Sequence, residues 1–346
     1  MSAPWWRPDR LALRHARLAA RGRILAAVRG FFADAGYVEV ETPALQLSPG
    51  LEPHLQAFAT HLHDPQDGAA KRRYLHTSPE FAMKKLVAGG LPRIWQLAHV
   101  FRNNERSATH HPEFAMLEWY RAGASYRDVM DECEGLLRRA QDAAGADGLR
   151  WQGRVADAGA PWQRLSVAKA FARYAGIDLL ATMPDPGNPD AALLAAAATE
   201  IGVAPHADDD WETLFFRIFL DRIEPNLGSG APTILYDYPI TMAALARPKP
   251  DEPRFAERFE LYVCGLELAN AFGELTDPTE QRRRFLADQA RKQALYGETY
   301  PIDEDFLAAL EFGLPDCAGI ALGFDRLVML ATGAQHIEEV LWAPVT

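Results

Sequence analysis

The sequence has little cysteine and no long apolar run. Cys133, Cys264 and Cys317 are the only cysteines in 346 residues, and their spacing fits neither a disulfide framework nor a CxxC metal pair. No stretch approaches the roughly 18 consecutive apolar residues that a membrane-spanning helix needs. These absences argue against a disulfide-stapled secreted domain and against a membrane protein, so we expect a cytoplasmic protein with reduced thiols.

The chain also lacks an excess of positive charge. Its 36 Lys and Arg residues against 47 Asp and Glu residues give a net charge of −11. No broad basic surface is therefore expected, and electrostatic steering would favour cationic partners, which weighs mildly against tRNA. His54, His61 and His63 lie close together in the sequence, but no cysteine or further acid is spaced to complete a zinc site with them.

What the chain does contain is enough apolar material for one large domain, since 48% of its residues are hydrophobic. Apolar residues at helical spacing predict an amphipathic helix over residues 16–35, followed by a strand over 37–40. Ser78, Pro79 and Glu80 form a strong helix start, with a capping hydroxyl, a proline for the first turn and an acid.

Two alternating segments, 94–102 and 113–121, predict an antiparallel hairpin across a polar loop. The first strand ends at Arg102. In the second strand, the period of two places Glu118 and Tyr120 on the same face of the sheet. An arginine beside carboxylate and aromatic groups indicates a site for a nucleotide and a small cationic molecule.

A second hairpin is predicted over residues 259–272, with its turn at Cys264 and Gly265. Glu260 and Glu267 then lie diagonally on one face, roughly 7–8 Å apart between Cα atoms. Like charges at that separation repel each other, and Mg²⁺ ions that bridge to phosphate oxygens would resolve the repulsion. For the pair taken alone, two solvated acids on an exposed sheet face remain the alternative.

Near the C-terminus, residues 319–330 predict a strand, a turn at Gly323 and a helix that ends at Gly333. Glycine permits a close approach of the backbone to a flat base or a phosphate. Arg326 lies in the first turn of this helix, where its guanidinium can meet a phosphate as a rigid fork. The less informative stretch over residues 140–210 is interpreted as an insertion.

Taken in order, these segments resemble the class II aminoacyl-tRNA synthetases in their lysine-specific form. The resemblance implies an α+β fold, an antiparallel sheet flanked by helices, in a homodimer. We therefore expect a single class II synthetase-like catalytic domain over residues 1–346, with a variable insertion at about residues 140–210. The segments that carry the resemblance are residues 31–43, 101–120, 259–275 and 319–330.

For the nucleotide, the resemblance implies that Arg102 grips the α-phosphate and the substrate carboxylate, that Phe114 stacks on adenine and that Arg326 holds the γ-phosphate. Glu260 and Glu267 would bind Mg²⁺. The full set expected along ATP is Arg102, Asn103, Asn104, His111, Phe114, Glu260, Leu261, Gly323 and Arg326.

Two residues depart from the family pattern at the nucleotide site. Asn104 stands where the family usually has the glutamate that accepts the adenine amino group, and Glu105 follows one place later. The adenine contact is then either weakened or supplied by a shifted residue. His111 replaces the usual asparagine before the proline of the same motif.

For the amino acid, the resemblance implies a pocket for a lysine-type substrate. Glu80 would meet the substrate amino group and Asn270 would assist at its carboxylate, while Glu118, Tyr120 and Glu274 would surround the distal ammonium. A buried ammonium needs paired carboxylates, and a neutral side chain would leave those acids uncompensated. The expected set is Ser78, Pro79, Glu80, Glu118, Tyr120, Glu267, Asn270, Glu274 and Ala321.

The resemblance is closest to the free-standing paralogues that ligate (R)-β-lysine to elongation factor P. The first motif is under way by Phe31, which leaves no room for an anticodon-binding barrel of order 100 residues ahead of it. Ala321 stands where the synthetases typically have glycine, and its methyl group on the pocket floor suits a β-amino acid.

We therefore expect an enzyme that uses ATP and Mg²⁺ to activate lysine or (R)-β-lysine as an aminoacyl-adenylate. It would transfer the aminoacyl group to a lysine side chain of elongation factor P. Two alternatives remain open at this point. One is a truncated lysyl-tRNA synthetase-like enzyme that charges tRNA, and the other is a non-catalytic amino-acid or nucleotide sensor, which Asn104 supports best.

Overall fold

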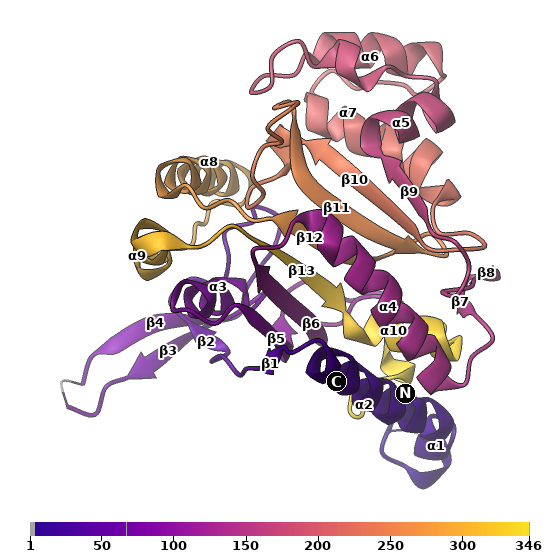
Figure 1. Ribbon diagram of the computed structural model, residues 1–346. Coiled ribbons are helices and arrows are strands. Elements are labelled where there is room, and N and C mark those ends of the chain that lie inside the picture. The colour runs from indigo at the N-terminus through magenta and orange to yellow at the C-terminus, as the bar shows by residue number, and fades with distance from the viewer. Residues whose placement is uncertain (1–3, 67, 346) are drawn as a thin grey trace.

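The computed structural model describes residues 4–66 and 68–345 (Figure 1). The α-helices are α1 (Pro8–Ala12), α2 (His15–Asp34), α3 (Glu80–Ala88), α4 (Tyr126–Ala144), α5 (Val167–Ala170), α6 (Ala191–Glu200), α7 (Trp211–Ile218), α8 (Pro278–Tyr296), α9 (Glu304–Gly313) and α10 (Phe324–Thr332). Short helical turns lie at Phe171–Ala175, Leu179–Thr182, Phe219–Ile223, Glu224–Asn226, Ile240–Met242 and Ile337–Glu339.

The strands are β1 (Val38–Glu39), β2 (Leu45–Gln46), β3 (Ala59–His63), β4 (Ala70–Leu75), β5 (Arg93–Phe101), β6 (Glu113–Ala122), β7 (Leu149–Trp151), β8 (Arg154–Ala156), β9 (Gln163–Ser166), β10 (Thr233–Pro239), β11 (Phe255–Val263), β12 (Leu266–Gly273) and β13 (Cys317–Gly323). Across the described residues, eight of them form one sheet in the order β1-β5-β6-β13-β12-β11-β10-β9. Neighbours from β5 to β10 run antiparallel, and only the two edge pairs are parallel. The predicted α+β class, with an antiparallel sheet flanked by helices, is confirmed.

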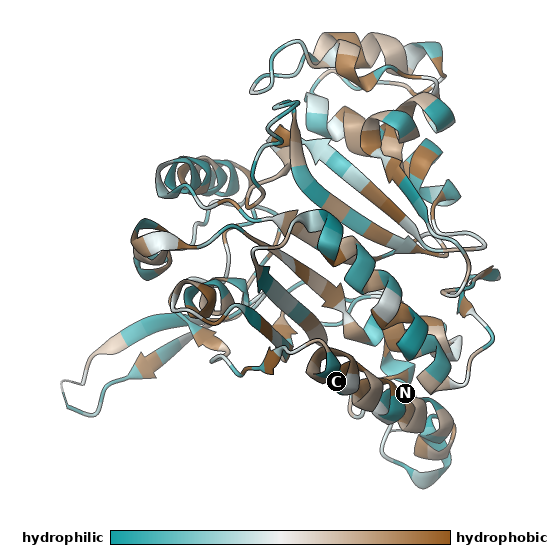
Figure 2. Cartoon of the chain, viewed as in Figure 1, coloured by the Kyte–Doolittle hydropathy of each residue, from teal (hydrophilic) through white to brown (hydrophobic). Residues whose placement is uncertain are grey.

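Alternation along the central strands gives the sheet two different faces. On β6, Leu117 and Trp119 pack into the main core with α2, α4 and α10, which cover one face of the sheet in Figure 1. Glu118 and Tyr120 lie on the other face, where α3, α8 and α9 enclose a second apolar cluster. Figure 2 shows this mixture of polar and apolar residues along the strands and the mostly polar surface of α8.

The predicted elements near the site are found where the sequence placed them. The helix expected over residues 16–35 is α2, and the first hairpin pairs β5 with β6 from Arg93 and Arg121 to Phe101 and Glu113. The start of α3 differs slightly from the prediction. Pro79 caps this helix instead of opening it, while the Ser78 hydroxyl still accepts a hydrogen bond from the Glu80 backbone N–H, at 3.0 Å.

The turn of the second hairpin lies at Cys264 and Gly265, as predicted, and both residues have positive φ, 55° and 77°. Tyr262 pairs with Glu267, but the register then shifts, so that Glu260 pairs with Asn270. The bulge adds one residue to β12. It was not predicted, because the sequence of polar and apolar residues in this strand gives no sign of the added residue. Tyr262, Glu267 and Asn270 share the face that carries Tyr120.

The segment over residues 140–210 contributes a strand to the main sheet. Its strand β9 pairs in parallel with β10 at the sheet edge. The helices α5, α6 and α7 then bury an apolar cluster of their own against that edge, centred on Phe171 and Phe215, and lie together at the top of Figure 1. Its interpretation as a variable insertion stays a prediction.

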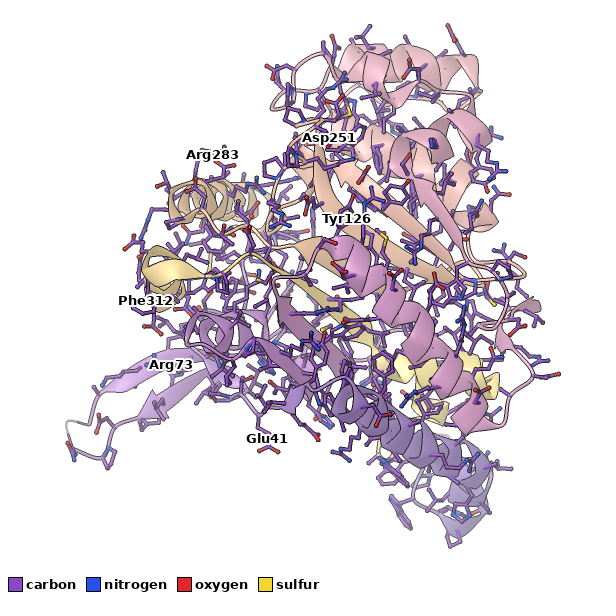
Figure 3. The ribbon with its side chains drawn as sticks, viewed as in Figure 1. Glu41, Arg73, Tyr126, Asp251, Arg283 and Phe312 are labelled. Atoms are coloured by element: carbon purple, nitrogen blue, oxygen red, sulfur yellow. The ribbon has the colours of Figure 1, made fainter. Side chains whose placement is uncertain are left out.

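The structure also bears on membrane-spanning helices and on the cysteines. In the described part of the chain, no helix combines the length and the apolar character needed to cross a membrane. Cys133, Cys264 and Cys317 are all buried and none forms a disulfide. Figure 3 labels Tyr126 at the start of α4. The Tyr126 hydroxyl donates a hydrogen bond to Asp237 at 2.7 Å and so connects this helix to the strand β10.

Candidate active site

A cavity of about 360 Å³ lies on the sheet face opposite α2 and α4. Its floor is formed by β6, β12 and β13, and its walls come from α3, the loop after β5 and the start of α10. The structure therefore gathers segments that are far apart in the chain. The expected site residues that line it are Ser78, Glu80, Arg102, Phe114, Tyr120, Glu267, Asn270, Glu274, Ala321, Gly323 and Arg326.

Small residues on β13 make room for the functional side chains on its neighbours. Gly319 pairs with Tyr120 across the sheet, and a Cβ atom at Gly319 would overlap both the Tyr120 ring and the Glu274 carboxylate. Ala321 pairs with Glu118 on one side and with Asn270 on the other. The pattern of glycine and alanine on this strand thus sets the depth of the cavity floor.

Two arginines without carboxylate partners occupy one end of the cavity. Arg326 donates hydrogen bonds to the backbone oxygen of Glu267 at 2.7 Å and to Nε2 of His110 at 2.8 Å. Arg102 lies over the Phe114 ring, 5.2 Å from its centroid. Among the residues that the structure describes, neither guanidinium forms an ion pair, and the two are close enough to repel each other. This end is suited to an anion such as a phosphate chain.

His110 accepts the hydrogen bond from Arg326 because it is neutral. Burial lowers its pKa, and the positive charges of Arg326 and Arg102 lower it further. Sequence reasoning missed this residue and selected its neighbour His111. The spacing gives no signal that separates the two histidines, since the choice depends on which one the loop turns toward Arg326.

Two acids lie near the arginines, in unequal environments. Glu260 is held by Tyr238, Tyr262 and Arg258, which donate hydrogen bonds to it at 2.5, 2.6 and 2.5 Å. Glu267 lines the cavity and has no such partner in the described chain. Burial and the negative charge of Glu260 raise the pKa of Glu267 to about 7.

The other end of the cavity is strongly acidic. Glu118 is fully buried, and it accepts hydrogen bonds from the Ser78 hydroxyl at 2.6 Å and from the Tyr120 hydroxyl at 3.0 Å. Burial and the charge of Glu80 raise its pKa to about 8, although both hydrogen bonds act in the opposite direction. Both donors are neutral, and in the described part of the chain Glu118 forms no ion pair that would balance its charge.

A lysine that sequence reasoning missed balances the two remaining acids of this end. The buried Lys84 ammonium lies 2.5 Å from a carboxylate oxygen of Glu80 and 2.5 Å from one of Glu274. Burial disfavours its charged form, but Glu274 and Glu80 outweigh that effect and raise the pKa of Lys84. The signal in the sequence was the spacing of four between Glu80 and Lys84, which puts both on one side of a helix.

Several expected residues lie outside the cavity lining. Asn103 and Asn104 bond to Gln56 in a neighbouring loop, and His111 is buried beneath the C-terminal segment, where its Nε2 accepts from the Val345 backbone at 3.2 Å. Their expected contacts with a nucleotide stay predictions. The expected residues outside the lining are Pro79, Asn103, Asn104, His111, Glu118, Glu260 and Leu261.

Glu105 lies at the cavity in the place expected for Asn104. It lines the same wall as Thr109 and His110. Its Oε2 atom is buried and has no hydrogen-bond partner in the described part of the structure. The shift of the acid by one position therefore leaves a carboxylate that can still face a ligand.

Comparison with known proteins agrees with this geometry. The family model for tRNA synthetases class II (D, K and N) matches residues 10–346. The chain is similar to proteins named elongation factor P (R)-β-lysine ligase. It is 40% identical to that of Klebsiella pneumoniae subsp. pneumoniae over 326 residues, 94% of this chain and 93% of the relative.

Two more relatives carry the same name. The protein of Pectobacterium atrosepticum is 40% identical over 338 residues, 97% of this chain and 96% of the relative. The protein of Vibrio parahaemolyticus is 39% identical over 330 residues, 95% of each chain. Because the family model covers nearly the whole chain and relatives of this identity span it from end to end, the chain belongs to the class II tRNA synthetase family.

Proposed function

We propose that this protein uses ATP to activate (R)-β-lysine, or lysine itself, as an aminoacyl-adenylate and transfers the aminoacyl group to a lysine side chain of elongation factor P. The family and the named relatives make the broader class plain, and the protein is an ATP-dependent amino-acid ligase. The relatives named for this reaction are matched along nearly their full length, which supports the complete reaction and not only its first half.

The observation that carries the proposal is the separation of charge inside one cavity. In the described chain, Arg102 and Arg326 line one end without carboxylate partners. At the other end, Glu118 lies buried directly behind the lining residues Ser78 and Tyr120, which bond to it, and forms no ion pair. A diamino acid brings a carboxylate and ammonium groups that match this arrangement, while a neutral side chain would leave Glu118 uncompensated.

In the first step, a carboxylate oxygen of the amino acid attacks the α-phosphorus of ATP. The bond from that phosphorus to the oxygen bridging the β-phosphate breaks, and pyrophosphate leaves. The substrate carboxylate is already ionised at neutral pH, so no general base is needed. Arg102 would neutralise charge at the α-phosphate and Arg326 would hold the departing end, so that catalysis comes from positioning and electrostatics.

Mg²⁺ is part of the proposal, and the acids near Arg326 support it. Glu267 lines the cavity, has a raised pKa, and its carboxylate has no hydrogen-bond partner among the described residues. These are the properties of a carboxylate that can accept a hard cation. Glu260 could join it only by giving up one of its bonds to Arg258, Tyr238 or Tyr262. When bound, the cation would neutralise charge on the phosphate oxygens.

Adenine recognition is proposed to involve Phe114 and Glu105. Phe114 packs with Met116 and Ala321 beside Arg102, which gives a flat apolar surface for the base. The Oε2 atom of Glu105 lacks a partner and can accept from the adenine amino group. This residue would take the role that the family usually gives to the position of Asn104.

In the second step, the ε-amine of a lysine on elongation factor P attacks the carbonyl carbon of the adenylate. An amide bond forms, the bond from the carbonyl carbon to the phosphate oxygen breaks, and AMP leaves. The attacking amine must arrive without its proton, because the ammonium form has no lone pair.

The choice of a β-amino acid is supported by Ala321. Its methyl group stands on the cavity floor between Glu118 and Asn270. This methyl group would hold the substrate backbone farther from the floor, which suits a β-amino acid, whose amino group lies one carbon farther along than in α-lysine. Because Ala321 is paired with strands on both sides, its methyl group has a fixed position and can contribute to substrate selection.

We also propose that the protein works as a cytoplasmic homodimer that does not use tRNA. The segment that resembles the first class II motif lies at the edge of the main sheet, where Val38 on β1 is 51% exposed. A second copy that covers this edge would bury this side chain, and an unprotected edge strand invites such pairing.

The first step is tested by ATP–pyrophosphate exchange with (R)-β-lysine, with α-lysine and without amino acid. Exchange is expected with lysine substrates only, and Arg326→Ala should abolish it. Arg283→Ala is the matched control, because Arg283 lies on the exposed surface of α8 (Figure 3). Exchange that is absent with every amino acid, or that is independent of amino acid, would overturn the proposal.

A further inference from the structure

Glu52 is an acid of the cavity that is not among the site residues expected from the sequence. It lies in the loop between β2 and β3 and lines the same cavity as Ser78, Glu80 and Arg102. Its Oε2 atom is buried and has no hydrogen-bond partner among the residues described. A buried carboxylate oxygen without a partner is costly, so its position at a ligand cavity calls for a ligand group.

The loop that carries Glu52 is held in place from two sides. The buried ammonium of Lys292 on α8 donates hydrogen bonds to the backbone oxygens of Pro53 at 3.0 Å and Leu55 at 2.7 Å. On the other side, the Thr77 hydroxyl donates to the backbone oxygen of Pro49 at 2.7 Å. These contacts fix the backbone on both sides of Glu52, as a binding residue requires.

Gly50 is needed for this position of the carboxylate. Its φ is 127°, and a Cβ atom there would lie 2.7 Å from Oε2 of Glu52 and 2.9 Å from the Thr77 hydroxyl. Any other residue at this position would strain the backbone and displace the Glu52 side chain. The sequence therefore accepts a restricted loop conformation that directs this carboxylate inward.

Among the described residues Glu52 forms no ion pair, although the Lys292 ammonium lies near enough to interact with its charge. Lys84 is already held by Glu80 and Glu274, and Arg102 lies at the phosphate end. Burial and then the charge of Glu80 raise the pKa of Glu52, whereas Arg102 and Lys84 lower it. Asp288 on α8 adds to the negative potential, and its own pKa is raised to about 7 by burial and by Glu52.

The acidic end thus contains two carboxylates that form no ion pair within the described chain. Glu118 lies buried behind Ser78 and Tyr120, and Glu52 lies on the loop wall. A lysine-type substrate has two ammonium groups. We propose that Glu52 binds the amino group nearer to the substrate carboxylate, while Glu118 binds the distal ammonium, so that the two acids together select a diamino acid. This inference rests on the proposed function, because it concerns the substrate of the same site.

The test removes one charge from the enzyme and the matching group from the substrate. Binding of (R)-β-lysine is compared with binding of 6-aminohexanoate, which keeps the carboxylate and the distal ammonium but lacks the nearer amino group. We expect the wild type to prefer (R)-β-lysine by at least about tenfold, because loss of a buried ionic partner has such an effect. Glu52→Gln should lose most of this preference.

A second analogue separates the two acids. 3-Aminohexanoate keeps the nearer amino group but lacks the distal ammonium. The ratio of the affinity for (R)-β-lysine to the affinity for 3-aminohexanoate should be the same in Glu52→Gln as in the wild type. A purely structural role for Glu52 would weaken binding of all three compounds equally and would not change these ratios. Glu41→Gln is the matched control on the same stretch of chain, since Glu41 is exposed (Figure 3).

Calorimetric binding and pyrophosphate exchange distinguish failure of this inference from failure of the proposed function. If the wild type activates lysine and Glu52→Gln discriminates between the compounds as the wild type does, the role of Glu52 is wrong and the ligase function stands. If binding shows the expected ratios but exchange is absent, the ligase function fails and the role of Glu52 stands. A wild type that binds 6-aminohexanoate as tightly as (R)-β-lysine would also overturn the inference.

Discussion

Substitution of Lys84 by methionine should destabilise the folded protein strongly, and in a way that depends on pH. Lys84 is fully buried, and its ammonium is the cation shared by Glu80 and Glu274. Methionine replaces the aliphatic part of the side chain but removes the charge. Loss of one partner of a buried ion pair costs roughly 3–5 kcal/mol of unfolding free energy, because the remaining charge stays buried.

The dependence on pH follows from the two acids that the substitution leaves behind. Burial already raises the pKa of Glu274 to about 7 against the lowering effect of Lys84, so loss of Lys84 should raise it further above its value in the unfolded chain. The contribution of Glu274 to stability is then present at low pH and lost as the pH rises through the folded-state pKa. The loss relative to the wild type should be smaller at about pH 5 than at about pH 8.

Urea unfolding at the two pH values measures this difference. A variant that combines Lys84→Met with Glu80→Gln and Glu274→Gln is the control, since it has no uncompensated charge. It should recover most of the lost unfolding free energy. A loss below about 1 kcal/mol at pH 8 for Lys84→Met, or a loss that is equal at both pH values, would refute the reasoning.

Four further predictions concern the site. Gly319→Ala should raise the KM for the amino acid at least about tenfold in pyrophosphate exchange, because its Cβ atom would overlap the Tyr120 ring and the Glu274 carboxylate; an unchanged KM would contradict this account of the cavity floor. Glu105→Ala should raise the KM for ATP by about tenfold while Asn104→Ala leaves it unchanged, and the reverse result would restore the family's usual position as the adenine contact. Ala321→Gly should shift the ratio of kcat/KM from (R)-β-lysine toward α-lysine, and a ratio equal to that of the wild type would remove Ala321 from the account of selectivity. Binding of (R)-β-lysine at pH 7 should release protons, detected by calorimetry in buffers of different ionisation heat, because an ammonium favours the charged form of Glu118, whose pKa is about 8 in the free protein; affinity should therefore increase as the pH rises from about 6 to 8, and proton uptake would contradict it.

The fold and the strand positions of the site could be predicted from local patterns. The two-residue repeat of side-chain direction along β6 placed Glu118 and Tyr120 on one face. Gly323, the last residue of β13, marked the start of α10, which carries Arg326. These features depend on residues that are near one another in sequence. Their packing onto the helices follows from the alternation itself.

The partners of the acids could not be predicted in the same way. Lys84 meets Glu274, which lies in a different hairpin, and only the packing of α3 against the sheet brings them together. Glu52 belongs to a loop without a repeating pattern, whose conformation depends on Lys292 from α8. Sequence reasoning also assigned both Glu260 and Glu267 to a cation, whereas the register shift and the donors around Glu260 make them unequal.

The most direct test of the central claim is the intact mass of elongation factor P after incubation with this protein, ATP and (R)-β-lysine. The account predicts a mass gain of one lysyl residue, dependent on ATP and absent with the Arg326→Ala variant. An elongation factor P of unchanged mass, in a reaction where the same enzyme charges tRNA with lysine, would contradict it.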